Sequence, residues 1–253
     1  MTIFWRSIQG EGTITFSHYL FLLRPLYLKS LVQSIFLSLL TAFLGMLFGF
    51  PAALALQHLL SHRQKNISIT LAATAANFAG VPLAVAFMIL LGLNGFLTRL
   101  LFHRGFMSSV PFTLYSFTGL VLLYLYFQIP LFVVLIMPAL EGLRKEWREA
   151  VSTLGGNGYL YWVKVGFPVL SPALLGCFIL LYANSFGAYA TAFALVGAKF
   201  RLLPIQISLA VAGNVGYDPH AASAMAMVMI AGLLVLFSFY IRLRKRFALW
   251  VSG

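Results

Sequence analysis

Five long stretches of this chain contain no Asp, Glu, Lys or Arg, and this feature limits its fold more than any other. The hydrocarbon core of a bilayer is about 30 Å thick, and a helix of about 20 apolar residues crosses it. Each stretch has at least that length and is flanked by charged residues or by glycine and proline. The sequence therefore predicts an all-α integral membrane protein with five membrane-spanning helices, near residues 32–56, 69–93, 115–139, 172–196 and 221–241.

The composition agrees with a surface that faces a lipid bilayer. Hydrophobic residues make up 61% of the chain and charged residues only 9%, whereas a water-facing surface carries about 25–35% charged residues. The net charge of +12 does not indicate a nucleic-acid partner, because the basic residues are spread thinly between the apolar stretches. Their placement is typical of membrane topology instead.

The basic residues also predict an orientation. If the C-terminus is cytoplasmic, segments 57–68 and 140–171 and the C-terminal end hold 10 of the 17 Lys and Arg residues on the inner side. We therefore expect a transmembrane domain at 32–246 and a short cytoplasmic tail at 247–253. Residues 1–31 are interrupted by charge and are expected to form an extracytoplasmic interfacial segment. This leaves open whether a first membrane helix is missing from the N-terminus.

The connection at residues 140–171 differs from the others because it is long and charged, yet carries apolar residues at helical spacing. These residues predict one amphipathic helix and are Leu140, Leu143, Trp147, Val151 and Leu154. Gly155 and Gly156 could end this helix in a left-handed conformation. Asn157 could then cap a second short helix that Pro168 closes. Joining two spans needs far fewer residues, so the loop is expected to dock on a soluble partner.

The same loop carries a resemblance to a known family. Glu149-Ala150-Val151 is followed after three residues by Gly155, and after nine more by Val165-Gly166-Phe167-Pro168. This spacing resembles the EAA loop of the permease subunits of ABC importers, with Val for the second Ala, Val for Ile and Phe for Leu. Gln128-Ile-Pro130 before the loop and the run from Asn184 to Thr191 after it resemble the branch with spermidine/putrescine, thiamine and iron(III) permeases.

The resemblance implies a transport subunit that works with other chains. Its partners would be a dimer of ABC ATPase subunits, a second permease subunit that is related but different, and an extracytoplasmic solute-binding protein, assembled in a bacterial inner membrane. The chain itself would bind no cofactor, since ATP and Mg²⁺ are used by the ATPase. In the family, the first helix of the loop packs against the membrane domain and the short helix fills an ATPase groove. The residues expected to couple to the ATPase are Glu149, Ala150, Gly155, Asn157, Tyr159, Trp162 and Pro168.

Signatures of catalysis and metal binding are missing from the sequence. It contains no Gly-x4-Gly-Lys-Ser/Thr, His-Glu-x-x-His or Gly-x-Ser-x-Gly motif, so no catalytic residue is predicted and the chain is not expected to be an enzyme. His58 and His62 share a helical face, but no acidic or thiolate residue lies near them in sequence, so no metal site is predicted. Cys177 is the single cysteine, which excludes an intrachain disulfide.

Polar side chains inside the apolar stretches are candidates for the solute pathway, because such residues are costly in lipid. The predicted pathway residues are Asn77, Gln128, Asn184, Ser185 and Tyr189. The competing interpretation is that they form hydrogen bonds between helices. Gly45 and Gly49 form a Gly-x3-Gly pair that favours close helix packing. No acidic residue lies inside the stretches, and the solute stays open.

Two other functions are alternatives to the importer permease. An ATP-independent channel or carrier would want an ionisable residue within the membrane, and the five stretches contain no Asp, Glu, Lys, Arg or His. A membrane scaffold without transport activity is compatible with the composition. It would have no need of the 140–171 loop, and this favours the permease.

Overall fold

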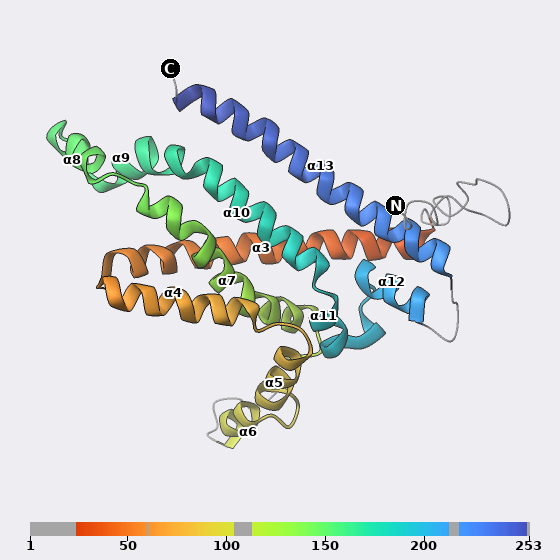
Figure 1. Cartoon of the computed structure of the whole chain (residues 1–253). Helices are drawn as coiled ribbons and strands as arrows, with labels where there is room; N and C mark the ends of the chain where they lie inside the picture. Colours follow the sequence, from red (N-terminus) through yellow and green to blue (C-terminus); the bar gives the residue numbers. More distant parts are fainter. Residues whose placement is uncertain (1–23, 60, 104–112, 213–217, 252–253) are drawn as a thin grey trace.

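The computed structural model describes residues 24–251 except residue 60, 104–112 and 213–217. The described part is helical and contains no strand, and its helices carry the labels of Figure 1. They are α3 (Pro25–Leu59), α4 (His62–Asn77), α5 (Val81–Leu91), α6 (Phe96–His103), α7 (Phe117–Glu141), α8 (Lys145–Thr153), α9 (Gly158–Tyr161), α10 (Phe167–Gly187), α11 (Tyr189–Val196), α12 (Leu203–Ala212) and α13 (Pro219–Val251).

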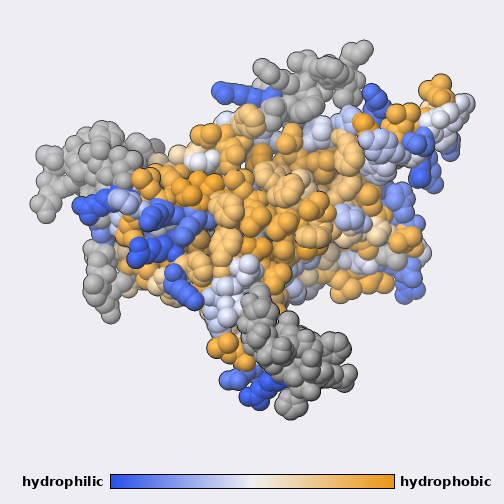
Figure 2. Space-filling view, turned by 180° about the vertical axis from the view of Figure 1, so that it is seen from behind, coloured by the Kyte–Doolittle hydropathy of each residue, from blue (hydrophilic) through white to orange (hydrophobic). Residues whose placement is uncertain are grey.

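Five helical segments of the described chain are long and apolar enough to cross a membrane. They are Pro25–Leu59, Val81–Leu100, Phe117–Glu141, Gly158–Gly187 and Pro219–Arg242. Figure 2 shows a broad hydrophobic surface over the middle of the molecule, with hydrophilic residues gathered toward its ends. The predicted all-α membrane fold is therefore confirmed, although two of the spans differ from the prediction.

Helices α3 and α7 run parallel and in close contact, and the Gly-x3-Gly pair lies at this contact. A Cβ atom on Gly49 would lie 2.7 Å from the Phe132 ring, and one on Gly45 would lie 3.0 Å from Gln128 Cβ. Near the end of α3, Gln57 Nε2 donates a hydrogen bond of 2.8 Å to the carbonyl of Leu140, in the last turn of α7. The two backbones approach this closely because the glycines have no side chain.

Helix α10 lies antiparallel to both α3 and α7. Thr41 of α3 and Ser185 of α10 are joined by a hydroxyl–hydroxyl hydrogen bond of 2.8 Å. The Tyr124 hydroxyl of α7 donates to the Ala188 carbonyl, 2.8 Å away, just after α10. The three helices enclose the core, whose largest fully buried side chains include Tyr124, Phe127, Phe132, Leu37, Leu123, Ile136 and Leu181.

The predicted single span at 69–93 is wrong, because the chain breaks between α4 and α5. Helix α4 packs antiparallel to α7, from an ion pair between Lys65 and Glu141 to an edge contact between the rings of Phe78 and Tyr126, 6.5 Å apart. Gly80 then takes a φ of +79°, and Pro82 in the next turn has no N–H to donate. Helix α5 therefore starts in a new direction and leaves the bundle with α6 (Figure 1).

The predicted span at 172–196 is also interrupted. Helix α10 ends at Gly187 and α11 begins at Tyr189. The next two segments, Tyr189–Lys199 and Leu203–Ala212, are bent by 80° relative to each other. The start of α12 is held against α3, because the Leu203 N–H donates to Ser34 Oγ at 2.7 Å. The uninterrupted segment is Gly158–Gly187, which begins much earlier than the prediction.

The remaining long helices extend past their predicted ends. Helix α3 begins at Pro25, so residues 25–31 of the predicted interfacial segment are helical, whereas residues 1–23 lie outside the described part. Helix α13 continues to Val251 into the predicted tail. A Cβ on Gly176, in the first half of α10, would lie 3.0 Å from the Tyr240 hydroxyl of α13. The last turns of α13 thus lie toward the same end of the molecule as α8 and α9 (Figure 1).

Candidate functional site

The loop between α7 and α10, here called the coupling loop (residues 142–166), projects from one end of the bundle (Figure 1). Its first helix, α8, contains no buried residue. The prediction that this helix includes Leu140 is wrong. Leu140 is fully buried in the last turn of α7, and Arg144 has an extended backbone that separates α7 from α8.

Glycine and asparagine form the predicted turn after α8. Gly155 has a φ of +76°, and the Gly156 N–H donates to the Val151 carbonyl at 2.8 Å, as expected for a left-handed helix end. A Cβ on Gly155 would meet nothing within 4 Å, so the backbone conformation alone favours glycine there. Asn157 Oδ1 accepts a hydrogen bond of 2.9 Å from the Leu160 N–H, which confirms the predicted cap.

The tip of the coupling loop exposes apolar side chains. Leu154 is 87% exposed and Tyr159 is 76% exposed. Glu149 and Ala150, the first residues of the EAA-like pattern, are also exposed on α8. Large apolar side chains on a projecting turn are unfavourable in water, so this surface is suited to contact with another protein.

Two aromatic residues fix the base of the coupling loop to the bundle. Tyr161 is buried, and the Trp162 ring lies 5.9 Å from the Phe50 ring of α3 in an edge arrangement. A Cβ on Gly166 would lie 2.5 Å from the Trp162 ring, so Trp162 is held from both sides. Of the predicted ATPase-coupling aromatics, Tyr159 faces outward and Trp162 faces the membrane domain.

The prediction that Pro168 closes the second short helix is wrong. Pro168 lies near the start of α10 instead. The chain between α9 and α10 is a π-helical turn, Trp162–Gly166, in which the Phe167 N–H donates to the Trp162 carbonyl. A proline ring clashes with the carbonyl four residues earlier and offers no N–H. The wider π turn, with its i to i+5 hydrogen bonds, accommodates the proline, and the helical segment continues from Gly158 to Gly187.

A hollow of about 510 Å³ opens between the coupling loop and the adjacent ends of α3, α4 and α7. We call it the basic hollow, because its cationic side chains outnumber its two carboxylates. It is lined by Gln57, His58, Lys65, Glu141, Leu143, Arg144, Lys145, Arg148, Glu149, Tyr161 and Trp162. The side chain of His62 lies outside the described part of the chain.

Within the bundle, three of the predicted pathway residues belong to one polar network. The Gln128 amide donates to Ser185 Oγ at 2.6 Å and to the Leu181 carbonyl at 2.8 Å. Asn184 Nδ2 lies 3.4 Å from Gln128 Oε1, to which it donates. Gln128 and Ser185 are buried and Asn184 is exposed. The network joins α3, α7 and α10 through Thr41, a residue that the sequence reasoning missed.

The other two predicted pathway residues lie apart from this network. Asn77 is exposed at the end of α4, and its side chain donates within its own helix, to the Ala73 carbonyl at 2.8 Å. Tyr189 lies after the break in α10, and its hydroxyl accepts a hydrogen bond of 2.8 Å from Ser208.

A second hollow, of about 350 Å³, lies where the two helix breaks meet. The Gly80 N–H donates to Thr191 Oγ1 at 2.7 Å, which ties the break before α5 to the break before α11. The lining is small, polar or aromatic, without a charged side chain, and comprises Ala76, Ala79, Gly80, Phe127, Ala183, Asn184, Gly187, Ala188, Tyr189, Ala190 and Thr191. Asn184 and Tyr189 are the predicted pathway residues that reach it.

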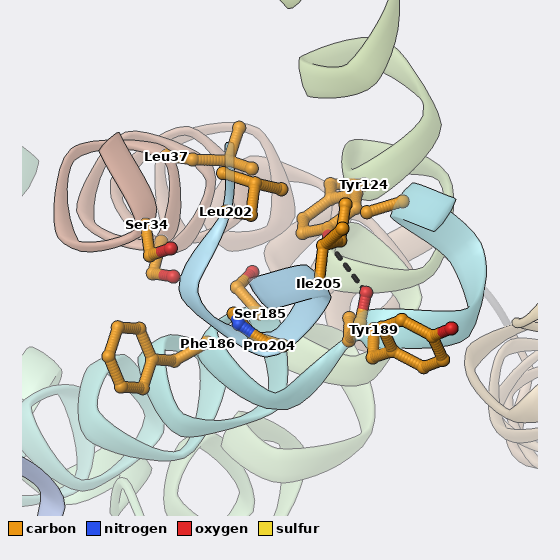
Figure 3. Close-up of a pocket in the computed structure, with 12 residues that line it drawn as sticks. Ser34, Leu37, Tyr124, Ser185, Phe186, Tyr189, Leu202, Pro204 and Ile205 are labelled. Atoms are coloured by element: carbon orange, nitrogen blue, oxygen red, sulfur yellow. Dashed lines mark hydrogen bonds between the residues drawn. The ribbon is translucent and has the colours of Figure 1, made fainter. Parts of the chain in front are cut away.

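A much smaller cavity of about 10 Å³ lies beside the start of α12 (Figure 3). Ser185 and Tyr189 line it together with Tyr124, whose hydrogen bond to Ala188 is drawn as a dashed line. This volume corresponds to about one water molecule. This cavity is therefore too small to hold a solute.

Comparisons with known proteins find similar transport permeases, although no family model matches the chain. It is 26% identical over 225 residues to the ferric transport system permease protein FbpB of Actinobacillus pleuropneumoniae, covering 87% of this chain and 32% of that protein. It is 30% identical over 175 residues to the sulfate transport system permease protein CysT of Salmonella typhimurium, covering 69% and 60%. Over 222 residues it is 21% identical to the spermidine/putrescine permease protein PotB of Escherichia coli, covering 88% and 80%.

Solved structures agree on the fold. A bacterial ABC transporter that imports alginate superposes with a TM-score of 0.77 at 14% identity, over 97% of this chain and 88% of that one. The inward-facing MetNI methionine ABC transporter gives 0.59 at 16% identity, over 86% and 96%. This chain is a homologue of ABC importer permeases.

As a permease homologue, the chain spans about a third of the ferric relative and 60% of the sulfate relative. Its fold adds two features that sequence reasoning missed, Thr41 in the polar network and the Lys65–Glu141 ion pair at the coupling-loop end. A sequence signal for the first existed, because Thr41 continues a row of small residues on α3. These residues are Ser30, Ser34, Ser38, Thr41, Gly45 and Gly49, and all are buried.

Proposed function

We propose that this chain is the membrane-spanning permease subunit of an ATP-driven ABC importer and that its coupling loop contacts a separate ATPase subunit. One observation carries the proposal. A helix–glycine–helix turn, held by hydrogen bonds at Gly156 and Asn157, projects between two bundle helices, with an exposed apolar tip and an aromatic base packed on α3. Such a turn can transmit a displacement to the bundle, whereas a flexible loop would absorb it.

The coupling residues divide into three roles in this proposal. Ala150 and Tyr159 face the ATPase, and Glu149 contacts it from the edge of the basic hollow. Gly155 and Asn157 set the shape of the turn. Trp162 and Pro168 pass movement of the loop into α3 and α10. The end of α7 is tied to α3 by the hydrogen bond from Gln57 to Leu140, so both helices that flank the loop would move with it.

The proposed solute route involves the hollow at the helix breaks. Asn184 and Tyr189 line this hollow, and Gln128 and Ser185 support it by holding α10 against α7. Asn77 lies near this region on α4 without lining it. The names of the relatives refer to ferric, sulfate and spermidine/putrescine transport, so the proposal assigns the class of transport and no particular solute.

The proposed assembly contains more than one chain. We infer a dimer of ATPase subunits that uses ATP and Mg²⁺, a second and different permease subunit, and an external solute-binding protein. A solved bacterial alginate ABC transporter is in complex with a periplasmic protein that binds an alginate pentasaccharide. Because the last turns of α13 lie on the coupling-loop side, contact between the loop and a cytoplasmic ATPase would make the C-terminus cytoplasmic, in a bacterial inner membrane.

Replacement of an exposed leucine at the loop tip tests the proposal. We expect Leu154→Asp to reduce co-purification of an ABC ATPase with the tagged full-length chain from membranes about tenfold, because loss of a central apolar contact costs about 1–2 kcal/mol. Leu59→Asp is the matched control, since Leu59 is 80% exposed at the same end of the bundle. Absence of an ABC ATPase from the wild-type preparation, or equal loss in both variants, would contradict the proposal.

A further inference from the structure

We infer that the basic hollow binds the phosphate headgroup of an anionic phospholipid from the membrane leaflet at the coupling-loop end. This goes beyond the transport function and does not depend on it. The hollow is formed by residues at the ends of α3 and α7, the start of α4 and the inner face of α8. Its volume of about 510 Å³ lies in the range of small-ligand sites, about 300–1,000 Å³.

The charges of the hollow favour an anion. Lys65 and Glu141 form an ion pair and neutralise each other. Among the residues that the structure describes, no acidic side chain lies within 4 Å of Arg144, Lys145 or Arg148. The Arg144 guanidinium lies over the Trp147 ring, 5.9 Å from its centroid. Glu149 offsets one of these three cations, and the lining keeps an excess of positive charge before His58 is considered.

The position of the hollow favours a lipid over a soluble anion. Its α3 and α7 walls are the ends of membrane-spanning helices, where phospholipid headgroups lie. Tyr161 and Trp162 line the hollow, and such aromatic residues are enriched at the membrane–water boundary. Basic pockets between helices at this level are typical of lipid headgroup sites.

Exposed apolar residues next to the lining offer a surface for the acyl chains. Val163 and Phe167 follow Trp162 in the chain and are 42% and 45% exposed, and Leu59, which follows His58, is 80% exposed. A bound phospholipid would thus place its phosphate among the cations of α8 and its chains along the helix ends. A free phosphate would gain only the first of these contacts.

Native mass spectrometry of the delipidated full-length chain, titrated with phosphatidylglycerol and with phosphatidylcholine, tests the inference. We expect preferred binding of phosphatidylglycerol, and about 25-fold weaker binding in the K145Q/R148Q double variant, at about fivefold per lost cation. The matched control is R63Q/K164Q, which removes two exposed cations from the same end of the molecule but from outside the hollow. The control should retain binding within about twofold.

A variant of opposite sign protects the test against a folding defect. Glu149→Gln removes the carboxylate that offsets one cation of the hollow and should tighten phosphatidylglycerol binding about fivefold. Equal binding of both lipids, equal losses in the two double variants, or full competition by millimolar inorganic phosphate would overturn the inference. Loss of the bound lipid when the ATPase assembles would also overturn it, because the hollow would then belong to a protein contact.

Discussion

Glycine has opposite uses in the helix bundle and in the coupling loop. Gly49 has ordinary helical geometry, but a side chain there would collide with Phe132 at 2.7 Å. Gly155 has open space around it but a φ of +76°. In the bundle, small residues bring backbones together, and in the loop a glycine sets a backbone direction. The bundle therefore tolerates changes of volume poorly, whereas the loop tolerates changes of backbone conformation poorly.

The largest expected effect is in the bundle. Gly49→Leu should lower the free energy of unfolding by about 3 kcal/mol, because the new side chain overlaps the Phe132 ring and must separate α3 from α7. Thermal unfolding of the purified chain in one detergent measures this. Gly232→Leu on α13 is the control, since a Cβ there meets nothing within 4 Å. Similar destabilisation by both substitutions would contradict the close-packing role.

The buried polar network should contribute less than the close packing. Gln128→Leu removes the hydrogen bonds to Ser185 and Leu181 and should cost about 1–2 kcal/mol, the range for polar contacts between membrane helices. The same unfolding measurement applies, with Asn77→Leu as the control because Asn77 is exposed and bonds within its own helix. A larger loss from the Asn77 change would argue against the network as a link between helices.

The smallest effect on stability, and the clearest effect on coupling, is expected at Gly155. Gly155→Ala strains a left-handed position by about 1 kcal/mol, which should weaken binding of the ATPase subunit about fivefold. Gly158→Ala is the control, because a Cβ at either position meets nothing within 4 Å and only Gly155 has a positive φ. Unchanged affinity in the Gly155 variant would show that the turn geometry does not matter for docking.

The same difference explains which features the sequence could predict. The sequence predicted the spans at α3, α7 and α13, because each depends on the residues next to one another in the chain. The left-handed end at Gly155 and the cap at Asn157 were predicted for the same reason. Contacts between distant segments decided the errors. Leu140 follows the apolar period of the loop, yet it is buried in the last turn of α7, and Trp162 packs on Phe50 of α3.

The two helix breaks show the same limit. The break before α5 had a local signal, because Gly80 and Pro82 disfavour a continuous helix. The break at Ala188 had a weaker local signal, because a glycine, Gly187, precedes it but no proline follows. It is stabilised by partners far away in sequence, such as the hydrogen bond from Tyr124 to the Ala188 carbonyl. Sequence reasoning therefore placed Asn184 and Tyr189 in one span, whereas the fold puts the break between them.

Crosslinking from the loop tip tests the central claim most directly. In a Cys177→Ala background the chain has no other cysteine, so Tyr159→Cys carries a photoactivatable maleimide at one site only. Illumination of membranes that contain the assembled transporter should produce an adduct with an ABC ATPase subunit. The same label at Leu93→Cys, on the exposed link between α5 and α6, should produce none. Adducts with the ATPase from position 93 but not from position 159 would contradict the assignment of the coupling loop.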